Sequence, residues 1–403
     1  MLITGPINVV RLEGTINYNN NNIKKILYVF FDYHEDIRYQ TKCDSYESIT
    51  IDTYLYNLFK NTKKTVDFFM EIRQDNFSDQ NIQYQERYIE NIFNLYNKLN
   101  PKNNKINKNK NKNKNKNINN NNINNNIRFH YLDIRDFLEK EVNDLVYILI
   151  NQLNDVIQYK SITSYNFTNI YDSIMKIISK FSFFKNYFEN KPIEIKENYK
   201  QIIYYLDKIM KKYNNNTIIE KINKTYIKDI IEKIDIYIKN LTEIYTMFKT
   251  IEREKSQENK LNYKKKIKWT DVKDMPNIVS GFYSNNDLPK EILNKISDLY
   301  YTIYTQKTEI FLKITDLFFL RRFLDKDYVN LAISYTGAAH SCNYINVLVE
   351  LFDFKITHFS HSDEPNLKKL NNIAKTDFYK LNYILEPEYL IQCSDISGFP
   401  KDF

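Results

Sequence analysis

Residues 329–340, VNLAISYTGAAH, combine a strand pattern with a turn of small residues. The first part is a short apolar run of the buried-strand type. A small-residue turn then leads into helical spacing up to residue 352. Residues 354–359 return to strand character. A strand, a helix and a second strand in this order predict a βαβ unit, with parallel strands and a right-handed crossover.

The first part of the chain shows a similar alternation of elements. In residues 1–33 we expect two strands, with Gly14 ending the first run and residues 19–22 forming a hairpin tip. Residues 26–31 are fully apolar, as in a strand buried on both faces. Helical spacing follows at 49–60 and 81–99, and further strands are expected at 65–71 and 127–133. The sequence therefore predicts an α/β fold with a mostly parallel sheet core.

A long region of helical periodicity interrupts this core. Between residues 137 and 325, apolar residues recur at spacings of three and four, which is typical of amphipathic helices. Residues 269–286 break the pattern and are expected to form a loop. The predicted division is a first half of the core at 1–100, a core strand at 127–136, a helical insertion at 137–325 and a second half of the core at 326–403.

Residues 101–126 form a low-complexity insertion of Asn and Lys. This segment holds seven lysines and no acid, so it accounts for all but +1 of the net charge of +8. Its composition cannot bury enough apolar surface to offset the entropy of ordering, which predicts disorder. The insertion is either an expansion without a role in an A/T-rich genome or a segment that contacts nucleic acid.

Composition excludes several classes of protein. Hydrophobic residues make up 42% of the 403 residues, which is enough for a sizeable core and excludes a fully disordered chain. No apolar run is long enough to predict a membrane-spanning helix, and no secretory signal is expected. The chain has three well-separated cysteines, which favours free thiols in a reducing, intracellular compartment.

Chemically useful side chains follow the predicted strands, where open α/β sheets place their sites. Asp32 and His34 end one strand and Glu71 ends the next. The strand at 127–133 ends in Asp133, with Arg135 two residues later. His130 also lies in this strand, but it would point to the face opposite Asp133. Gly337 and His340 follow the strand of the opening stretch.

Two imidazoles and a carboxylate on converging loops suit a divalent cation. We expect His34, Glu71 and His340 to bind Mn, Co or Zn, with Glu71 also able to take a proton. Asp133 and Arg135 are expected to orient groups in the same pocket.

The order of these motifs resembles the Tiki/TraB and erythromycin-esterase-like superfamily. In that group an early strand ends in His and a later strand ends in Glu. An Arg and a final G-x-x-H motif follow, which correspond here to Arg135 and to Gly337 with His340. The first motif, FDYH (residues 31–34), lacks the Gly of the family pattern. The resemblance implies an α/β fold with helical insertions and, for some members, metal-dependent hydrolysis. The opening segment also resembles uncharacterised proteins of giant DNA viruses.

The function predicted from this resemblance is metal-dependent hydrolysis of an amide or ester bond in a peptide or ester substrate. One alternative is a catalytically inactive structural or interaction protein of a large DNA virus, located in the virion or host cytoplasm. Its Tyr-rich helices would then bind a protein partner. A second alternative is association with nucleic acid through residues 101–126.

Other interpretations of single residues stay open at this point. Glu71 could form a surface ion pair with Arg73 or Arg87. Cys342 is either a nucleophile or, as buried thiols usually are, inert. His358 and His361 could form a separate metal-binding pair.

Overall fold

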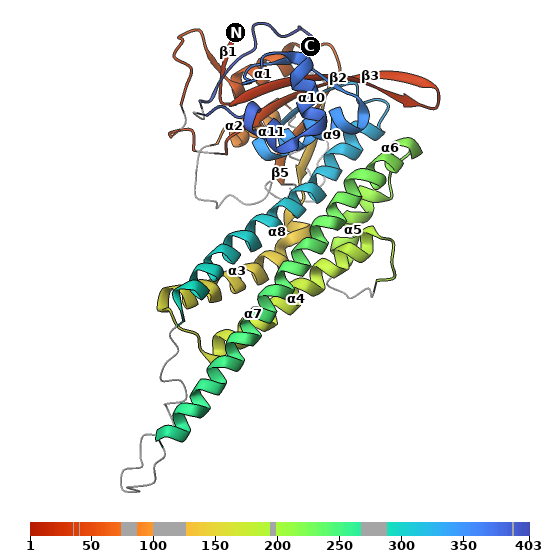
Figure 1. The fold of residues 1–403 in the computed structure, drawn as a ribbon. Helices are drawn as coiled ribbons and strands as arrows, with labels where there is room; N and C mark the ends of the chain where they lie inside the picture. Colours follow the sequence, from red (N-terminus) through yellow and green to blue (C-terminus); the bar gives the residue numbers. More distant parts are fainter. Residues whose placement is uncertain are drawn as a thin grey trace, which may run out of the picture. The chain divides into compact units, whose positions relative to one another are not determined.

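The computed structural model describes residues 1–34, 36–39, 41–73, 87–99, 126–193, 199–266, 288–388 and 391–403. Most of the predicted Asn/Lys insertion, residues 101–125, and the whole predicted loop at 269–286 lie outside these residues. The chain forms two compact units (Figure 1). The sheet unit comprises residues 1–134, 206–222 and 315–403, and the helical unit comprises residues 135–205 and 223–314.

A six-stranded sheet forms the centre of the sheet unit, with the order β6-β5-β7-β3-β2-β8. Its strands are β2 (Asn8–Tyr18), β3 (Asn21–Asp32), β5 (Val66–Arg73), β6 (Ile127–Asp133), β7 (Leu331–Gly337) and β8 (Lys355–Phe359). The pairings from β6 to β3 are parallel, whereas β2 is antiparallel to both β3 and β8. The α/β class is therefore confirmed, and the sheet is mixed because the hairpin inserts one reversed strand.

The β2–β3 hairpin is longer than its sequence indicates. Its tip is Asn19-Asn20, and both residues have positive φ angles, as a two-residue type I′ turn requires. The prediction that Gly14 ends the first strand is wrong, because β2 continues to Tyr18. A Cβ at residue 14 would lie only 2.3 Å from the ring of Phe354. Glycine at this position therefore serves close packing inside the strand.

The predicted βαβ unit is present. After β7 the chain forms α9 (Ala338–Phe352) and then β8, which runs in the same direction as β7 but lies beyond β3 and β2. Gly337 is the N-cap of α9 and joins strand to helix without an intervening loop. This direct junction places the first turn of α9 at the carboxyl end of β7.

Helices cover both faces of the sheet. On one face, α1 (Ile51–Asn61) and α2 (Tyr88–Leu99) pack against a core of buried apolar side chains that includes Phe30, Phe68 and Ile333. On the other face, Phe319 of α8 (Lys290–Asp325) contacts Phe69 of β5 and Tyr344 of α9. The helices α10 (Leu367–Thr376) and α11 (Phe378–Leu385) complete this layer beside α9.

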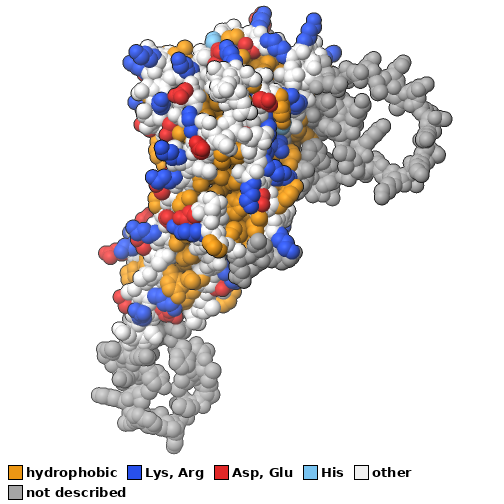
Figure 2. All heavy atoms as spheres, turned by 90° about the vertical axis from the view of Figure 1, so that its right-hand side faces the viewer, with side chains coloured by type: hydrophobic (Ala, Val, Ile, Leu, Met, Phe, Trp, Pro, Cys, Tyr) orange, Lys and Arg blue, Asp and Glu red, His pale blue; other side chains and the backbone are white. Residues whose placement is uncertain are grey.

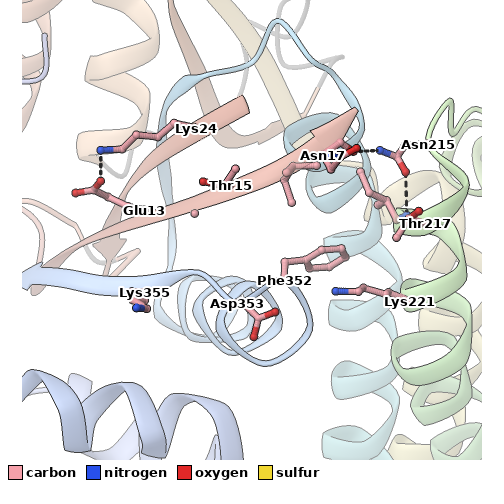
Figure 3. A pocket seen from close by; sticks show the side chains of 13 residues that line it. Glu13, Thr15, Asn17, Lys24, Asn215, Thr217, Lys221, Phe352, Asp353 and Lys355 are labelled. Carbon is pink, nitrogen blue, oxygen red and sulfur yellow. Dashed lines mark hydrogen bonds and ion pairs between the residues drawn. The ribbon is translucent and has the colours of Figure 1, made fainter. Parts of the chain in front are cut away.

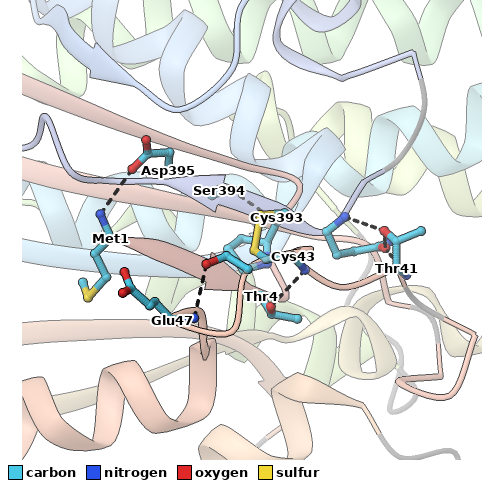
Figure 4. Close-up of a disulfide and its surroundings, with 11 residues drawn as sticks. Met1, Thr4, Thr41, Cys43, Glu47, Cys393, Ser394 and Asp395 are labelled. Carbon is cyan, nitrogen blue, oxygen red and sulfur yellow. Dashed lines mark hydrogen bonds and ion pairs between the residues drawn. A yellow bond between two sulfur atoms is a disulfide. The ribbon is translucent and has the colours of Figure 1, made fainter.

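A second, small sheet ties the two ends of the chain together. It has the order β4-β1-β9, formed by Ile49–Thr50, Leu2–Thr4 and Cys393–Asp395. Beside it, a disulfide joins Cys43 to Cys393, 350 positions apart in the sequence (Figure 4). The expectation of free thiols is therefore wrong for these two residues, because spacing along the chain says nothing about distance in the fold. Cys342 is free and buried.

The helical unit is built from long helices that carry the predicted periodicity. Its described elements are α3 (Arg135–Tyr159), α4 (Ser164–Phe188), the start of α5 (Lys200–Met210), most of a π-helical turn (Ile222–Ile227) after α6 (Asn216–Lys221), α7 (Lys228–Lys266) and the first part of α8. Its core contains packed aromatic rings such as Phe181, Tyr237 and Phe311. The end of α8, from Thr315, belongs to the sheet unit.

Hydropathy and charge describe the surface of the described residues. Over the described residues, no helix has the length and apolar character needed to cross a bilayer. On the face drawn in Figure 2, basic side chains are spread among acidic and uncharged ones.

Candidate functional site

The carboxylate of Glu71, at the end of β5, lies between two histidines. Its Oε2 is 3.1 Å from His34 Nε2, and its Oε1 is 3.3 Å from His340 Nε2. Its side chain is only 4% exposed, so Glu71 does not lie at the surface. The fold therefore brings together the three residues that sequence analysis selected, from β5, from the segment after β3 and from α9. We call these three residues the histidine–glutamate cluster.

The outer part of this cluster is His34. It follows β3 and has a φ angle of 35°, a left-handed conformation that non-glycine residues seldom adopt outside constrained sites. Its Nδ1 lies 2.7 Å from Asp32 Oδ2, and Tyr335 donates a hydrogen bond of 2.8 Å to the other oxygen of Asp32. The side chain of His34 is 39% exposed, so the cluster reaches solvent on this side.

The inner part is His340, in the first turn of α9. Its Nδ1 is hydrogen-bonded to Asp316 Oδ1 at 2.5 Å, and Asn343 Nδ2 donates to the other oxygen of Asp316 at 2.5 Å. Asp316 and Asn343 are fully buried, and the side chain of His340 is 6% exposed. Both histidines thus have the same arrangement, with Nδ1 toward an aspartate of their own and Nε2 toward Glu71.

Gly337 explains the spacing of the G-x-x-H motif. Its backbone N–H donates a hydrogen bond of 2.8 Å to Glu71 Oε2. A Cβ at this position would lie 2.9 Å from His34 Nε2 and 3.4 Å from Glu71 Oε2, too close to the imidazole. A residue without a side chain therefore lets the strand pass directly under the cluster, and the helix that starts there delivers His340 three residues later.

The carboxylates control the protonation of the cluster. Burial alone would lower the pKa of each histidine. Hydrogen bonds with Asp32 and Glu71 raise the pKa of His34 to about 10. Coulombic attraction and hydrogen bonds from Asp316 and Glu71 likewise raise the pKa of His340 to about 10. For Glu71 burial would raise the pKa, but the two imidazoles hold it well below its usual value. The site thus strongly favours positive charge between its carboxylates.

The other residues predicted for the site are Asp133 and Arg135, and His130 lies in the same strand as Asp133. Asp133 is buried at the end of β6, where it pairs in register with Arg73 of β5. Arg135 opens α3, which belongs to the helical unit, so its role toward the cluster stays a prediction. His130 turns to Asp67, with its Nε2 2.8 Å from Asp67 Oδ1. Its polar neighbour is therefore Asp67 rather than Glu71.

Two further alternatives can be compared with the structure. Cys342 is fully buried, and burial raises the pKa of its thiol well above the usual value. A buried thiol is a poor nucleophile, so the burial of Cys342 supports the inert alternative. His358 contacts the hydroxyl of Thr357, whereas His361 lies 3.7 Å from Asp363, so each has a different polar neighbour.

Sequence reasoning missed Asp316 and Asn343 entirely. Asp316 sits in the apolar run FLKITDLFFL (residues 311–320) of a helix that reads as ordinary core. The available signal was the carboxylate itself, since acids are almost never fully buried unless they are paired.

The histidine–glutamate cluster is closed by its own contacts. In the described residues, no group of three or more His, Cys, Asp and Glu side chains is arranged so that it could hold a metal ion. Histidines that bind metals usually donate their other ring N–H to a carboxylate, and both histidines here have that partner.

A separate pocket of about 500 Å³ lies beside the β2–β3 hairpin (Figure 3). Its polar lining is largely engaged, because Lys24 pairs with Glu13 and Asn215 donates to the backbone carbonyl of Asn17. The residues that line it include no member of the histidine–glutamate cluster.

Comparison with known proteins identifies relatives over the full chain. The chain is 35% identical over 441 residues to "Uncharacterized protein R706" of Acanthamoeba polyphaga mimivirus, covering 100% of this chain and 97% of that protein. It is 29% identical over 468 residues to "Uncharacterized protein R161" of the same virus, covering 100% and 98%. These relatives confirm the resemblance to proteins of a giant DNA virus. No solved structure matches the chain significantly. A family model matches residues 1–403, and the chain belongs to that family, DUF5847, a family of unknown function.

Proposed function

We propose that this protein is a metal-dependent hydrolase in which His34, Glu71 and His340 bind one divalent cation. One observation carries the proposal. Both histidines point Nε2 at the same carboxylate, while the Nδ1 of each lies within 2.7 Å of a separate buried aspartate. Such pairing fixes the orientation of an imidazole and raises the basicity of the nitrogen that faces the cation.

The distances in the cluster are compatible with coordination. Ligands about 2.1 Å from a cation lie about 3.0 Å apart at right angles and about 3.4 Å apart in a tetrahedron. The separations of 3.1 and 3.3 Å between the two Nε2 atoms and Glu71 fall in this range. Imidazole nitrogen with carboxylate oxygen suits Zn, Co or Mn.

Charge supports the same conclusion. Three carboxylates, those of Asp32, Glu71 and Asp316, surround two imidazoles, so neutral histidines would leave an excess of negative charge. The raised pKa values of both histidines agree with an excess of negative charge that protons offset. A divalent cation would offset it equally well.

The hydrolytic part of the proposal rests on the resemblance to the Tiki/TraB and erythromycin-esterase-like superfamily. A cation bound here would lower the pKa of a coordinated water toward neutrality. The chain's own residues supply access to solvent and a fixed carboxylate. His34 leaves the site open to solvent on one side, and Glu71 is held by Gly337 in a fixed orientation. The proposed substrate is an amide or ester bond in a peptide or ester substrate, and Asp133 is proposed to orient it.

The test is hydrolysis of a panel of peptide amides and esters by protein freed of metal and then supplied with Mn²⁺, Co²⁺ or Zn²⁺. We expect turnover that depends on the cation and is lost in Glu71→Gln and His340→Gln, whereas His358→Gln retains it. Cation binding without turnover of any substrate would contradict the hydrolase and favour the inactive interaction protein.

A further inference from the structure

The end of β2 has an open edge, which comprises residues 14–18 on the side of β8. β2 pairs with β3 along its whole length, as far as Tyr18 opposite Asn21. On its other side β8 covers it only from Val10 to Glu13. Among the described residues, no strand pairs with that side from residue 14 onward. Unpaired N–H and C=O groups at a sheet edge are able to pair with another extended chain.

Alternate residues of β2 turn their backbone groups toward this side. Near the start of the strand, Val9 O accepts from the backbone N–H of Ser360, just beyond β8. Near its end, Asn17 O accepts from the side-chain amide of Asn215. Because the direction of the backbone groups alternates along a strand, Thr15 faces the same side as Val9 and Asn17. Thr15 is exposed, and no described residue forms a hydrogen bond with its backbone on this side.

The pocket beside the hairpin leaves room for a further strand along the open edge. It has a volume of about 500 Å³, and its lining follows β2 from Glu13 to Asn17 (Figure 3). Its other walls include Ile218 of α6 and Phe352 at the end of α9. Side chains of a strand alternate between two faces. One set of side chains on an added strand would therefore meet an apolar wall.

The charges of the pocket favour an acidic segment. Each carboxylate of the lining already has a basic partner, in the pairs Glu13–Lys24 and Asp353–Lys375. Two lysines of the lining, Lys221 and Lys355, have no carboxylate partner among the described residues. Lys355 lies opposite Glu13, so its side chain shares a face of the sheet with Thr15. An acidic residue placed beside Thr15 would therefore lie near an unpaired ammonium group.

We propose that the open edge of β2 binds an extended acidic segment of a partner protein as an added strand. Thr15 forms two backbone hydrogen bonds with this segment, and an acidic side chain of the segment lies beside Lys355. In such β-strand addition, backbone hydrogen bonds supply affinity and contacts of alternate side chains supply specificity. This binding is separate from the proposed hydrolysis, since no member of the histidine–glutamate cluster lines the pocket.

The charge preference is tested with two short fluorescent peptides, one of alternating Val and Glu and one of alternating Val and Lys. Fluorescence anisotropy with the full chain measures their binding. We expect the acidic peptide to bind at least about tenfold more tightly than the basic one. Lys355→Glu should weaken binding of the acidic peptide by about threefold to tenfold. Lys380→Glu makes the same charge change on α11, outside the pocket lining, and should have no effect.

The backbone pairing is tested with Thr15→Pro. Proline removes the N–H that faces the open edge, while the bonds between β2 and β3 do not use that group. We expect the affinity for the acidic peptide to fall at least about tenfold in Thr15→Pro. Thr15→Val keeps the N–H and should bind like the wild type. Thermal unfolding of both variants shows whether the fold is kept.

A second measurement of the backbone pairing needs no protein variant. The acidic peptide is N-methylated either at all its Val residues or at all its Glu residues. Because only alternate N–H groups of an added strand face β2, one of these two peptides should lose binding and the other should keep it.

Four results would overturn the proposal. They are equal binding of the acidic and basic peptides, unchanged binding by folded Thr15→Pro, an equal effect of both N-methylations, and a dimer of the wild type that dissociates in Thr15→Pro. The last result, measured by analytical ultracentrifugation, would assign the open edge to a second copy of this chain.

Discussion

The backbone N–H of Gly337 donates a hydrogen bond of 2.8 Å to Glu71 Oε2, so a strand end holds the carboxylate at the centre of the cluster. The same residue leaves room for His34, whose Nε2 would lie 2.9 Å from a Cβ at position 337. One glycine therefore sets both the orientation of Glu71 and its distance from an imidazole.

Gly337→Ala should separate His34 from Glu71 while the fold persists. The φ angle of −55° is accessible to alanine, so the conflict is steric and falls on the partly exposed ring of His34. We expect a loss of about 1–3 kcal/mol in the free energy of unfolding and at least about a tenfold loss of Zn²⁺ affinity. Calorimetric titration and thermal unfolding measure the two effects.

Gly398→Ala is the matched control, because a Cβ there meets no atom within 4 Å. It should change neither quantity. An unchanged Zn²⁺ affinity in Gly337→Ala would show that close approach of the strand is not needed for cation binding.

The sequence predicts the members of the cluster because they lie at strand ends. When the runs at residues 26–31, 65–71 and 329–337 are identified as strands of one sheet, their carboxyl ends lie at the same edge. The sequence then places three residues at that edge, namely His34, Glu71 and His340. The two supporting aspartates differ in this respect. Asp32 is adjacent to a strand end, whereas Asp316 comes from the last turns of a long helix that follows ordinary amphipathic spacing.

The parts of the fold that the sequence does not predict depend on distant pairings. The β4-β1-β9 sheet joins strands of two and three residues from opposite ends of the chain, and such short runs have no period of their own. The Cys43–Cys393 disulfide is not predicted for the same reason, because it joins residues from opposite ends of the chain. The extension of β2 beyond Gly14 depends on a contact with Phe354, which is 340 positions away.

Lys25 should make stability depend on pH. It is fully buried in β3, where its Nζ donates to the backbone carbonyls of Lys326 and Val329. Burial lowers the pKa of Lys25 to about 7, against about 10.5 in the unfolded chain. Between these values the unfolded state binds more protons, so the free energy of unfolding rises with pH by at most about 1.4 kcal/mol per unit.

Denaturant unfolding of wild type and Lys25→Met at pH 6, 8 and 9.5 measures this dependence. The stability of the wild type relative to Lys25→Met should increase with pH. The neighbouring exposed residue provides a control, since Lys24→Met should give no such trend. A constant difference between wild type and Lys25→Met across this range would contradict the lowered pKa of Lys25.

The disulfide should be present in protein purified without reductant and should stabilise the fold. Linking residues 350 positions apart restricts the unfolded chain, which typically contributes about 2–5 kcal/mol. Dithiothreitol should lower the thermal midpoint of the wild type and leave that of the Cys43→Ser, Cys393→Ser double variant unchanged. Thiol titration after denaturation should find only Cys342 reactive. Three reactive thiols in the unreduced wild type would show that the bond does not form.

The central claim is that His34, Glu71 and His340 together hold one divalent cation, and cation stoichiometry tests it most directly. Protein freed of metal is dialysed against Zn²⁺ or Mn²⁺, and the bound metal is measured by elemental analysis for the wild type and for Glu71→Gln, with His358→Gln as a control. We expect one equivalent per chain in the wild type and His358→Gln, and none in Glu71→Gln. Equal uptake by wild type and Glu71→Gln, or no uptake by any of the three, would contradict the central claim.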